Sequence, residues 1–309
     1  MNDSIYLCIK GVKINQIPEF YKKFKRISEN KIYKYHYKGI LFNYFLTSCS
    51  LLIMTTSSKI LGKNDIKESD VDEFVEKLKS IILEIVDIDI KKIKLNVCRF
   101  DYKVDVPMED KERHEMFNLK KKKKMRYRYI RMRKIYQTSI HLANHSSSRN
   151  INIYDKGVES GIPEFENVVR LELQIKHRGI IRLLNKEEKP RDIYYYWGKE
   201  AMEELFFKYF EGFLYTGTYY KLGQAIKIIE KSSYTRTLKK GLISFVSIVN
   251  KNGMLGAERF FSYNTIRKYE KLLDNINVNP ITIEDDAEIN EMENLLKRAR
   301  RIAEEKYFK

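Results

Sequence analysis

Three segments of this chain alternate polar and apolar residues, and this pattern constrains the fold more than any other feature. The segments are CRFDYKVDV at 98–106, NINIYDK at 150–156 and VRLELQIK at 169–176. Successive side chains of a β-strand point to opposite faces of a sheet, so this alternation predicts strands with one apolar and one polar face. We therefore expect an antiparallel sheet whose apolar face packs on helices.

The remaining periodicity predicts an α+β fold. Further strands are expected at 4–11, 32–38, 40–54 and 135–143, and apolar spacing near 3.6 residues predicts a helix at 70–86. The segment 110–134 is basic and compatible with a helix. Helical periods then dominate at 199–214, 218–231, 235–250, 262–275 and 286–306. We expect two regions: residues 1–180 form a core with an antiparallel sheet and flanking helices, and residues 181–309 form a mainly helical region.

The polar faces of the three segments carry carboxylates that would repel one another. If the strands are neighbours, Asp101, Asp105 and Glu172 share one surface. Acidic residues are depleted in strands, so three on one face suggest a shared counter-ion, and oxygen ligands suit Mg²⁺ or Mn²⁺. The alternative is an ordinary solvated sheet face with cross-strand pairs of opposite charge.

Tyr154 lies on the polar side of its segment, together with Lys156 two residues later. A divalent metal polarises a phosphodiester, and a phenolate can attack the phosphorus and become linked to it. Lys156 could favour the phenolate or hold the phosphate. Tyrosine is a good strand former and the chain has 22 tyrosines, so composition alone does not select Tyr154.

These residues resemble three motifs of the phage and plasmid rolling-circle replication initiators, of the filamentous-phage gene II type and the staphylococcal-plasmid Rep type. The first motif is Arg99-Phe100-Asp101 followed by Asp105, the second is INIYDK with Tyr154, and the third is VRLELQIK with Arg170, Glu172 and Lys176. Each motif alone is weak, but their order and spacing across 97–177 are similar to those of the family.

The resemblance implies an origin-specific nickase and strand transferase. Tyr154 would form a 5′-phosphotyrosine and release a 3′-hydroxyl that primes a polymerase, while Asp101, Asp105 and Glu172 would carry Mg²⁺ or Mn²⁺. Arg99, Arg170 and Lys176 would contact the DNA. The implied partners are single-stranded or cruciform origin DNA and a host helicase and polymerase. No second tyrosine lies three or four residues from Tyr154, so closing the displaced circle would need a second protomer, and hence a homodimer, or an activated water.

A strong basic excess predicts a polyanionic partner. The formal net charge is +17 and the pI is about 9.4. A/T-rich coding sequence also inflates lysine, so composition alone leaves a structural protein possible. The cations gather at 120–134, with tyrosines between them, and we expect either DNA contacts or a solvated loop. The candidate contacts there are Lys122, Arg126, Arg128, Arg131 and Arg133.

A second DNA-binding candidate lies in the helical region. The helices expected at 235–250 and 262–275 flank a break at Asn252-Gly253, and Ser262 is a suitable N-cap. Arg267 and Lys268 fall near the start of the second helix, as in a helix-turn-helix reader of duplex DNA. The alternative is an ordinary helical hairpin.

The other features exclude several classes. Three cysteines without CxxC spacing argue against a disulfide framework and a zinc site. The chain start lacks a signal-peptide pattern and no apolar stretch is long enough to span a bilayer, so we expect a cytoplasmic protein with no membrane partner. His141 and His145 suit one helix face but fall in an expected strand and turn. The same chemistry could serve a relaxase of a mobile element, and the basic surface alone could serve a non-catalytic nucleic-acid-binding protein.

Overall fold

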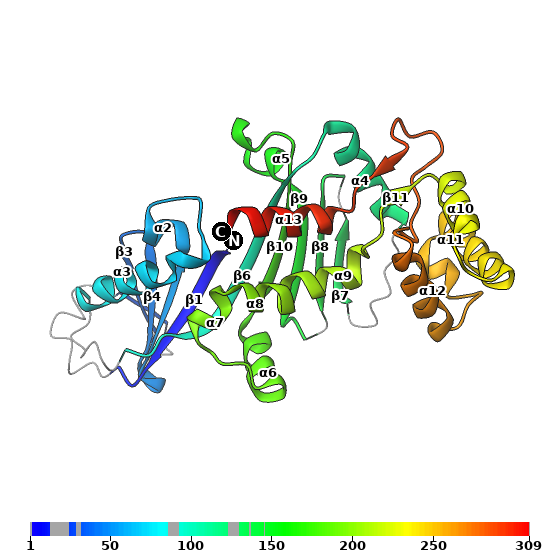
Figure 1. Ribbon diagram of the computed structural model, residues 1–309. Coiled ribbons are helices and arrows are strands. Elements are labelled where there is room, and N and C mark those ends of the chain that lie inside the picture. The colour runs from blue at the N-terminus through cyan, green and yellow to red at the C-terminus, as the bar shows by residue number, and fades with distance from the viewer. Residues whose placement is uncertain are drawn as a thin grey trace.

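The chain is built around a ten-stranded antiparallel sheet, seen in the computed structural model (Figure 1). The structure describes residues 2–12, 25–28, 32–85, 93–122, 130–135, 137–144 and 146–308. The strand order is β2-β3-β4-β5-β1-β6-β10-β9-β8-β7. Strand β6, which is the longest described, therefore lies near the middle, between the N-terminal strands and the later ones.

The strands that form this sheet follow the alternating segments closely. Their bounds are β1 Asn2–Lys10, β2 Lys25–Ser28, β3 Ile32–Tyr37, β4 Ile40–Phe45, β5 Ser50–Thr56, β6 Asn96–Pro107, β7 Ile130–Ile135, β8 Ser139–Asn144, β9 Arg149–Asp155 and β10 Val168–Ile175. A separate pair, β11 Tyr219–Tyr220 and β12 Glu291–Met292, ties two distant parts of the helical region together.

Helices occupy the connections and most of the chain after β10. The N-terminal ones are α2 Ser57–Leu61, α3 Val71–Leu83, α4 Asp110–Lys122 and α5 Lys156–Ser160. The later ones are α6 His177–Glu187, α7 Ile193–Trp197, α8 Lys199–Ala201, α9 Lys208–Leu214, α10 Leu222–Lys231, α11 Arg236–Ala257, α12 Tyr263–Asn275 and α13 Leu295–Lys306. A π-helical stretch, Met202–Phe207, makes α8 and α9 one continuous helix.

The apolar face of the sheet forms the core with helices that come later in the chain. Phe100, Tyr102 and Leu171 are fully buried on this face. Helices α7, α8, α9 and α13 cross it, whereas α10, α11 and α12 gather at one end of the molecule (Figure 1). The helical region after residue 180 therefore shares the core of the sheet, and its division from residues 1–180 as a separate unit stays a prediction.

The α+β fold class is confirmed, with a mainly helical C-terminal region. Two boundaries differ from the sequence pattern. The helix compatible with 110–134 ends at Lys122, because β7 pairs with β8 over Ile130–Ile135. The helix expected from 286 begins at Leu295, because the buried Asn294 side chain accepts a hydrogen bond from the backbone N–H of Leu296.

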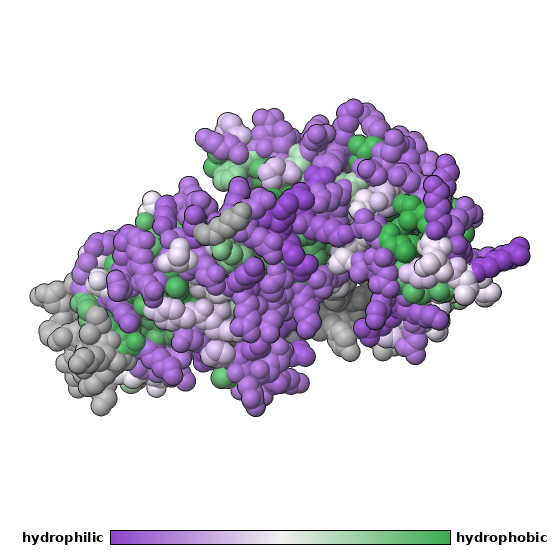
Figure 2. All heavy atoms as spheres, viewed as in Figure 1, coloured by the Kyte–Doolittle hydropathy of each residue, from purple (hydrophilic) through white to green (hydrophobic). Residues whose placement is uncertain are grey.

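In the part of the chain that the structure describes, no helix has the length and apolarity needed to cross a bilayer. Hydrophilic side chains cover most of the face seen in Figure 2.

The sheet and its covering helices are tied by a buried hydrogen bond. The Tyr102 hydroxyl donates to the carbonyl oxygen of Tyr196 at 2.7 Å. Tyr102→Phe leaves that buried carbonyl without this donor, so we expect it to lower the free energy of unfolding by about 1–2 kcal/mol in urea titrations. Tyr209→Phe is the control, since the Tyr209 hydroxyl makes no hydrogen bond with the described residues. Equal stability of the two variants would contradict this reading of the contact.

Candidate functional site

The three alternating segments are neighbours in the sheet, as the sequence pattern predicts. Strand β10 pairs with β6 on one side and β9 on the other. Arg170 is opposite both Tyr154 and Asp105, so these three residues form one row across the strands. The next rows are Asn152, Glu172 and Lys103, and then Asn150, Gln174 and Asp101. The polar side chains therefore share one face, and we call it the polar face.

Tyr154 lies between a carboxylate and two cations on this face. Its hydroxyl donates to Glu172 Oε2 at 3.3 Å, and Lys156 Nζ lies 5.9 Å from its ring centroid. Burial raises the pKa of the Tyr154 hydroxyl, the charge of Glu172 acts in the same direction, and Arg170 opposes both. The ligand-free site therefore holds the tyrosine as a neutral phenol with an acceptor for its proton.

Lys156 reaches Tyr154 from the next element rather than from the strand. It is the first residue of α5, and its ammonium also pairs with Glu159 at 2.5 Å. The ring of Phe165 lies 5.5 Å from Lys156 Nζ and 5.8 Å from the Arg170 guanidinium. Phe165 thus lies beside both cations near Tyr154, and no pattern in the sequence pointed to it.

On the polar face, Asp101 and Asp105 each pair with an arginine. Arg170 donates from Nε and Nη2 to Asp105 at 2.5 and 2.7 Å, and Arg99 binds both oxygens of Asp101. Burial raises the pKa of Asp101 to about 7, with Glu172 acting in the same direction and Arg99 opposing. Asp101 is only 1% exposed, and this burial makes the ionised form of its carboxyl group costly.

The three predicted metal ligands do not converge into one cluster. Among the described residues, no group of three or more histidine, cysteine, aspartate or glutamate side chains could hold a metal ion. Asp101 and Asp105 lie four residues apart on β6, a separation of about 13 Å along the strand. Asp105 is held by Arg170 on the Tyr154 row, which leaves Asp101 and Glu172 as the carboxylates that act on each other.

Asp101 and Glu172 are the two carboxylates here that could be offered to a hard cation. The amide nitrogens of Asn152 and Gln174 donate to Glu172 Oε1 at 3.4 and 2.6 Å. His141 on β8 contacts Asn152 Oδ1 at 2.9 Å through Nδ1. Mg²⁺ is commonly held by one or two carboxylates with waters and substrate phosphates, and these two carboxylates could supply that part of a site. The alternation places Asn152 and Gln174 on this face, but it does not predict their hydrogen bonds to Glu172.

Asp155, which follows Tyr154 in the second motif, has a structural role. Its side chain points to the opposite side of β9 from Tyr154, is 5% exposed and caps α5 by accepting from the backbone N–H of Val158. Arg113 of α4 pairs with it at 3.0 Å. Asp155 and Arg113 thus fix the chain at the point where Tyr154 leaves the strand.

The other predicted DNA contacts are placed only in part. Lys176 lies at the end of β10, with Nζ 2.9 Å from the amide of Asn150. Lys122, Arg131 and Arg133 lie in α4 and β7, and their side chains are outside the described atoms. Arg126 and Arg128, and also His145, fall outside the described residues.

The helical region presents Arg267 and Lys268 on the exposed side of α12. Ser262 caps this helix as predicted, since its hydroxyl accepts from the backbone N–H of Thr265. Gly253 interrupts α11 with φ of 68°, so the predicted break is present, although one further turn follows it. The exposed position of the two cations is compatible with a DNA contact, which stays a prediction.

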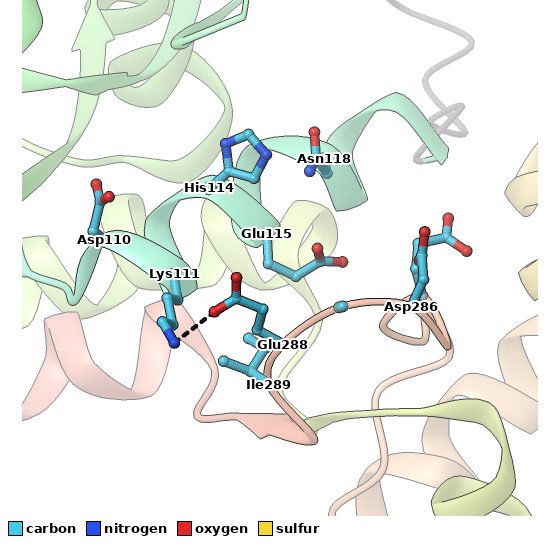
Figure 3. A pocket seen from close by; sticks show the side chains of 10 residues that line it. Asp110, Lys111, His114, Glu115, Asn118, Asp286, Glu288 and Ile289 are labelled. Carbon is cyan, nitrogen blue, oxygen red and sulfur yellow. Dashed lines mark ion pairs between the residues drawn. The ribbon is translucent and has the colours of Figure 1, made fainter.

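A separate cavity lies between α4 and the segment 284–289 (Figure 3). Its volume is about 610 Å³, and carboxylates dominate its lining: Asp110, Glu115, Glu284, Asp286 and Glu288. Lys111 pairs with Glu288 across it at 2.5 Å. The negative charge of this lining disfavours phosphate.

Comparison with solved structures gives a distant likeness. No protein-family model matches the chain. No curated protein matches it either. A solved structure of a rolling circle replication initiator protein from Geobacillus stearothermophilus is similar over 61% of this chain and 78% of that one, with 14% identity and a TM-score of 0.35.

The Arg113–Asp155 contact yields a test of the architecture. Arg113→Gln leaves the buried Asp155 carboxylate without its cation, so we expect the free energy of unfolding to fall by roughly 3 kcal/mol in urea titrations. Arg182→Gln, on the exposed side of α6, removes an arginine that has no ion pair with the described residues and should change stability by less than about 0.5 kcal/mol. A small effect of Arg113→Gln would mean that other contacts hold Asp155.

Proposed function

We propose that this protein nicks and rejoins single-stranded DNA through Tyr154, and so initiates rolling-circle replication of a phage or plasmid. The observation that carries the proposal is the position of the Tyr154 hydroxyl, which faces Glu172 and Arg170 on one polar sheet face. A sheet face with only a structural role does not need a tyrosine that donates to a buried carboxylate. A surface that only binds DNA gains nothing from buried negative charge. The resemblance of the three motifs to those of the initiators supports the same conclusion.

The reaction is a transesterification. The Tyr154 oxygen attacks the scissile phosphorus, the bond from phosphorus to the 3′ oxygen breaks, and a 5′-phosphotyrosine forms. The phenolic proton lies on a hydrogen bond to Glu172 Oε2, so an ionised Glu172 can accept it, and the departing 3′ oxygen takes up a proton to become a hydroxyl. Rejoining is the reverse reaction, with a 3′-hydroxyl attacking the phosphotyrosine.

The cations around Tyr154 match the charge of the substrate. Arg170 lies beside the hydroxyl and Lys156 beside the ring of Tyr154, and both cations also lie near the ring of Phe165. They can contact the non-bridging phosphate oxygens, and their charge favours the phenolate form of the nucleophile. Arg170 must share its guanidinium with Asp105, which sets its orientation.

Asp101 and Glu172 would hold Mg²⁺ or Mn²⁺, and Asp105 would act through Arg170. When bound, such an ion polarises the phosphodiester and stabilises the charge that develops on it. Host helicase and polymerase, a cruciform origin and a homodimer that closes the circle remain proposals that follow from the resemblance.

The direct test is a covalent adduct. Purified protein is incubated with Mn²⁺ and single-stranded fragments of the DNA that carries its gene, and products are separated on denaturing gels. We expect a protein–DNA adduct that requires metal and that is lost in Tyr154→Phe. Tyr209→Phe is the matched control and should retain it. An adduct in Tyr154→Phe would place the nucleophile elsewhere, and tight DNA binding without any adduct would favour a non-catalytic binding protein.

Metal binding tests the assignment of the carboxylates. We expect Asp101→Asn and Glu172→Gln each to weaken Mn²⁺ binding by at least about tenfold in calorimetric titration, and Asp105→Asn to have a smaller effect. Because the pKa of Asp101 is about 7, the proton competes with the metal below that pH, and affinity should fall by up to about tenfold per pH unit. A larger loss in Asp105→Asn than in Asp101→Asn would reverse the assignment.

The exposed cations of α12 would contact the duplex part of the origin. Replacing Arg267 and Lys268 with glutamine removes two phosphate contacts, so we expect weaker binding to duplex origin DNA with unchanged cleavage of a single-stranded substrate. Binding is measured by fluorescence anisotropy and cleavage on denaturing gels. Equal loss of both activities would contradict the separation of duplex binding from cleavage.

A further inference from the structure

Cations gather where β1 and β10 end and β6 begins, and along β10 this is the opposite end from the row of Tyr154. Strand β1 ends at Lys10, β10 ends just before Lys176, and the loop before α7 brings Arg191 to the start of β6, where its Nε donates to the carbonyl oxygen of Val97 at 3.1 Å. Arg178 follows in the first turn of α6, which projects from this end of the sheet (Figure 1). We call Lys10, Lys176, Arg178 and Arg191 the basic edge.

The basic edge differs from the polar face in how its charges are balanced. On the polar face, Arg99, Lys103 and Arg170 each have an aspartate partner. At the basic edge, none of the four cations makes an ion pair with a residue that the structure describes. Asp192, the residue that follows Arg191, caps α7 by accepting from the backbone N–H of Tyr194.

Two of the cations, Lys10 and Arg191, are close enough together to shift the pKa of the same neighbouring groups. His177 lies between Lys176 and Arg178, and its pKa is lowered by burial and then by the charges of Arg191 and Lys10. The same two cations lower the pKa of the neighbouring Cys8 thiol, on which the hydrogen bond with Cys98 has the larger effect. Residues from β1, the start of α6 and the loop before α7 thus produce one region of positive potential.

The edge continues the polar face along β10. From Arg170, in the row of Tyr154, to Lys176 is six residues, a distance of about 20 Å. Between them lie first Glu172, which with Asp101 is proposed to hold the metal, and then the neutral pair Gln174 and Asn150. An extended strand of nucleic acid that leaves Tyr154 in this direction passes the proposed metal and the neutral side chains before it reaches the four cations, which have no ion pair with the described residues.

We propose that the basic edge binds the backbone phosphates of the single strand whose scissile phosphate is at Tyr154. The direction of the DNA strand rests on the proposed function. The attraction of the four cations for a polyanion depends only on their charges. Lys10 and Arg178 are exposed and carry the test, because Arg191 also supports β6 through its hydrogen bonds.

The experiment measures the salt dependence of binding. A thymidine oligonucleotide of about 16 nucleotides, the upper end of the site size of single-strand-binding folds, is titrated by fluorescence anisotropy at several salt concentrations. Each phosphate contact contributes about 0.7 to the slope of log affinity against log salt for single strands. We therefore expect the double variant Lys10→Gln/Arg178→Gln to reduce the slope by about 1.4.

Two controls make the result specific. Lys59→Gln/Lys227→Gln removes the same charge from exposed positions on α2 and α10, and should leave the slope unchanged. Lys10→Arg/Arg178→Lys keeps the charge and should retain the wild-type slope. An unchanged slope in Lys10→Gln/Arg178→Gln, or an equal reduction in the α2/α10 control, would overturn the proposal.

The adduct assay on the same preparations separates this inference from the proposed function. A Tyr154 adduct together with an unchanged slope would support the nickase and contradict phosphate binding at the basic edge. A reduced slope without any adduct would support phosphate binding at the basic edge and contradict the nickase, together with the direction proposed for the strand.

Discussion

The pairing of β10 between β6 and β9 is the constraint on which the site depends. Because side chains alternate across a strand, this register decides that Tyr154, Arg170 and Asp105 meet in one row, with Glu172 in the next row and Asp101 in the row after it. A shift of β10 by one residue would turn Arg170 and Glu172 toward the core and Leu171 away from it. The apolar face, covered by helices from the end of the chain, therefore fixes the geometry of the polar one.

Pairs of opposite charge balance that polar face. Arginines neutralise Asp101 and Asp105, and Glu172 takes the hydrogen bond of Tyr154. Burial raises the pKa of Asp101 to about 7 and that of Tyr154 above its usual value, so the ligand-free site favours the neutral forms of both groups. Perturbed groups of this kind gather at functional sites more often than elsewhere.

Alternation predicted the strands and which residues share a face, because both depend on a local period of two residues. The same period could not show that Arg170 holds Asp105, since that choice depends on the cross-strand register. Phe165 and Arg113 were missed for a related reason: they come from a short turn and a helix that only the fold brings to Tyr154. The end of α4 was misplaced because the charges of 120–134 fit a helix while pairing with β8 makes 130–135 a strand.

The most direct measurement of the central claim is the site of covalent attachment. The adduct is trimmed with nuclease, digested with trypsin and analysed by mass spectrometry. Cleavage after Arg149 and Lys156 releases the peptide Asn150–Lys156, in which Tyr154 is the only tyrosine. The account predicts a nucleotide mass on this peptide, lost when metal is withheld. A nucleotide on a peptide carrying a different tyrosine would contradict it.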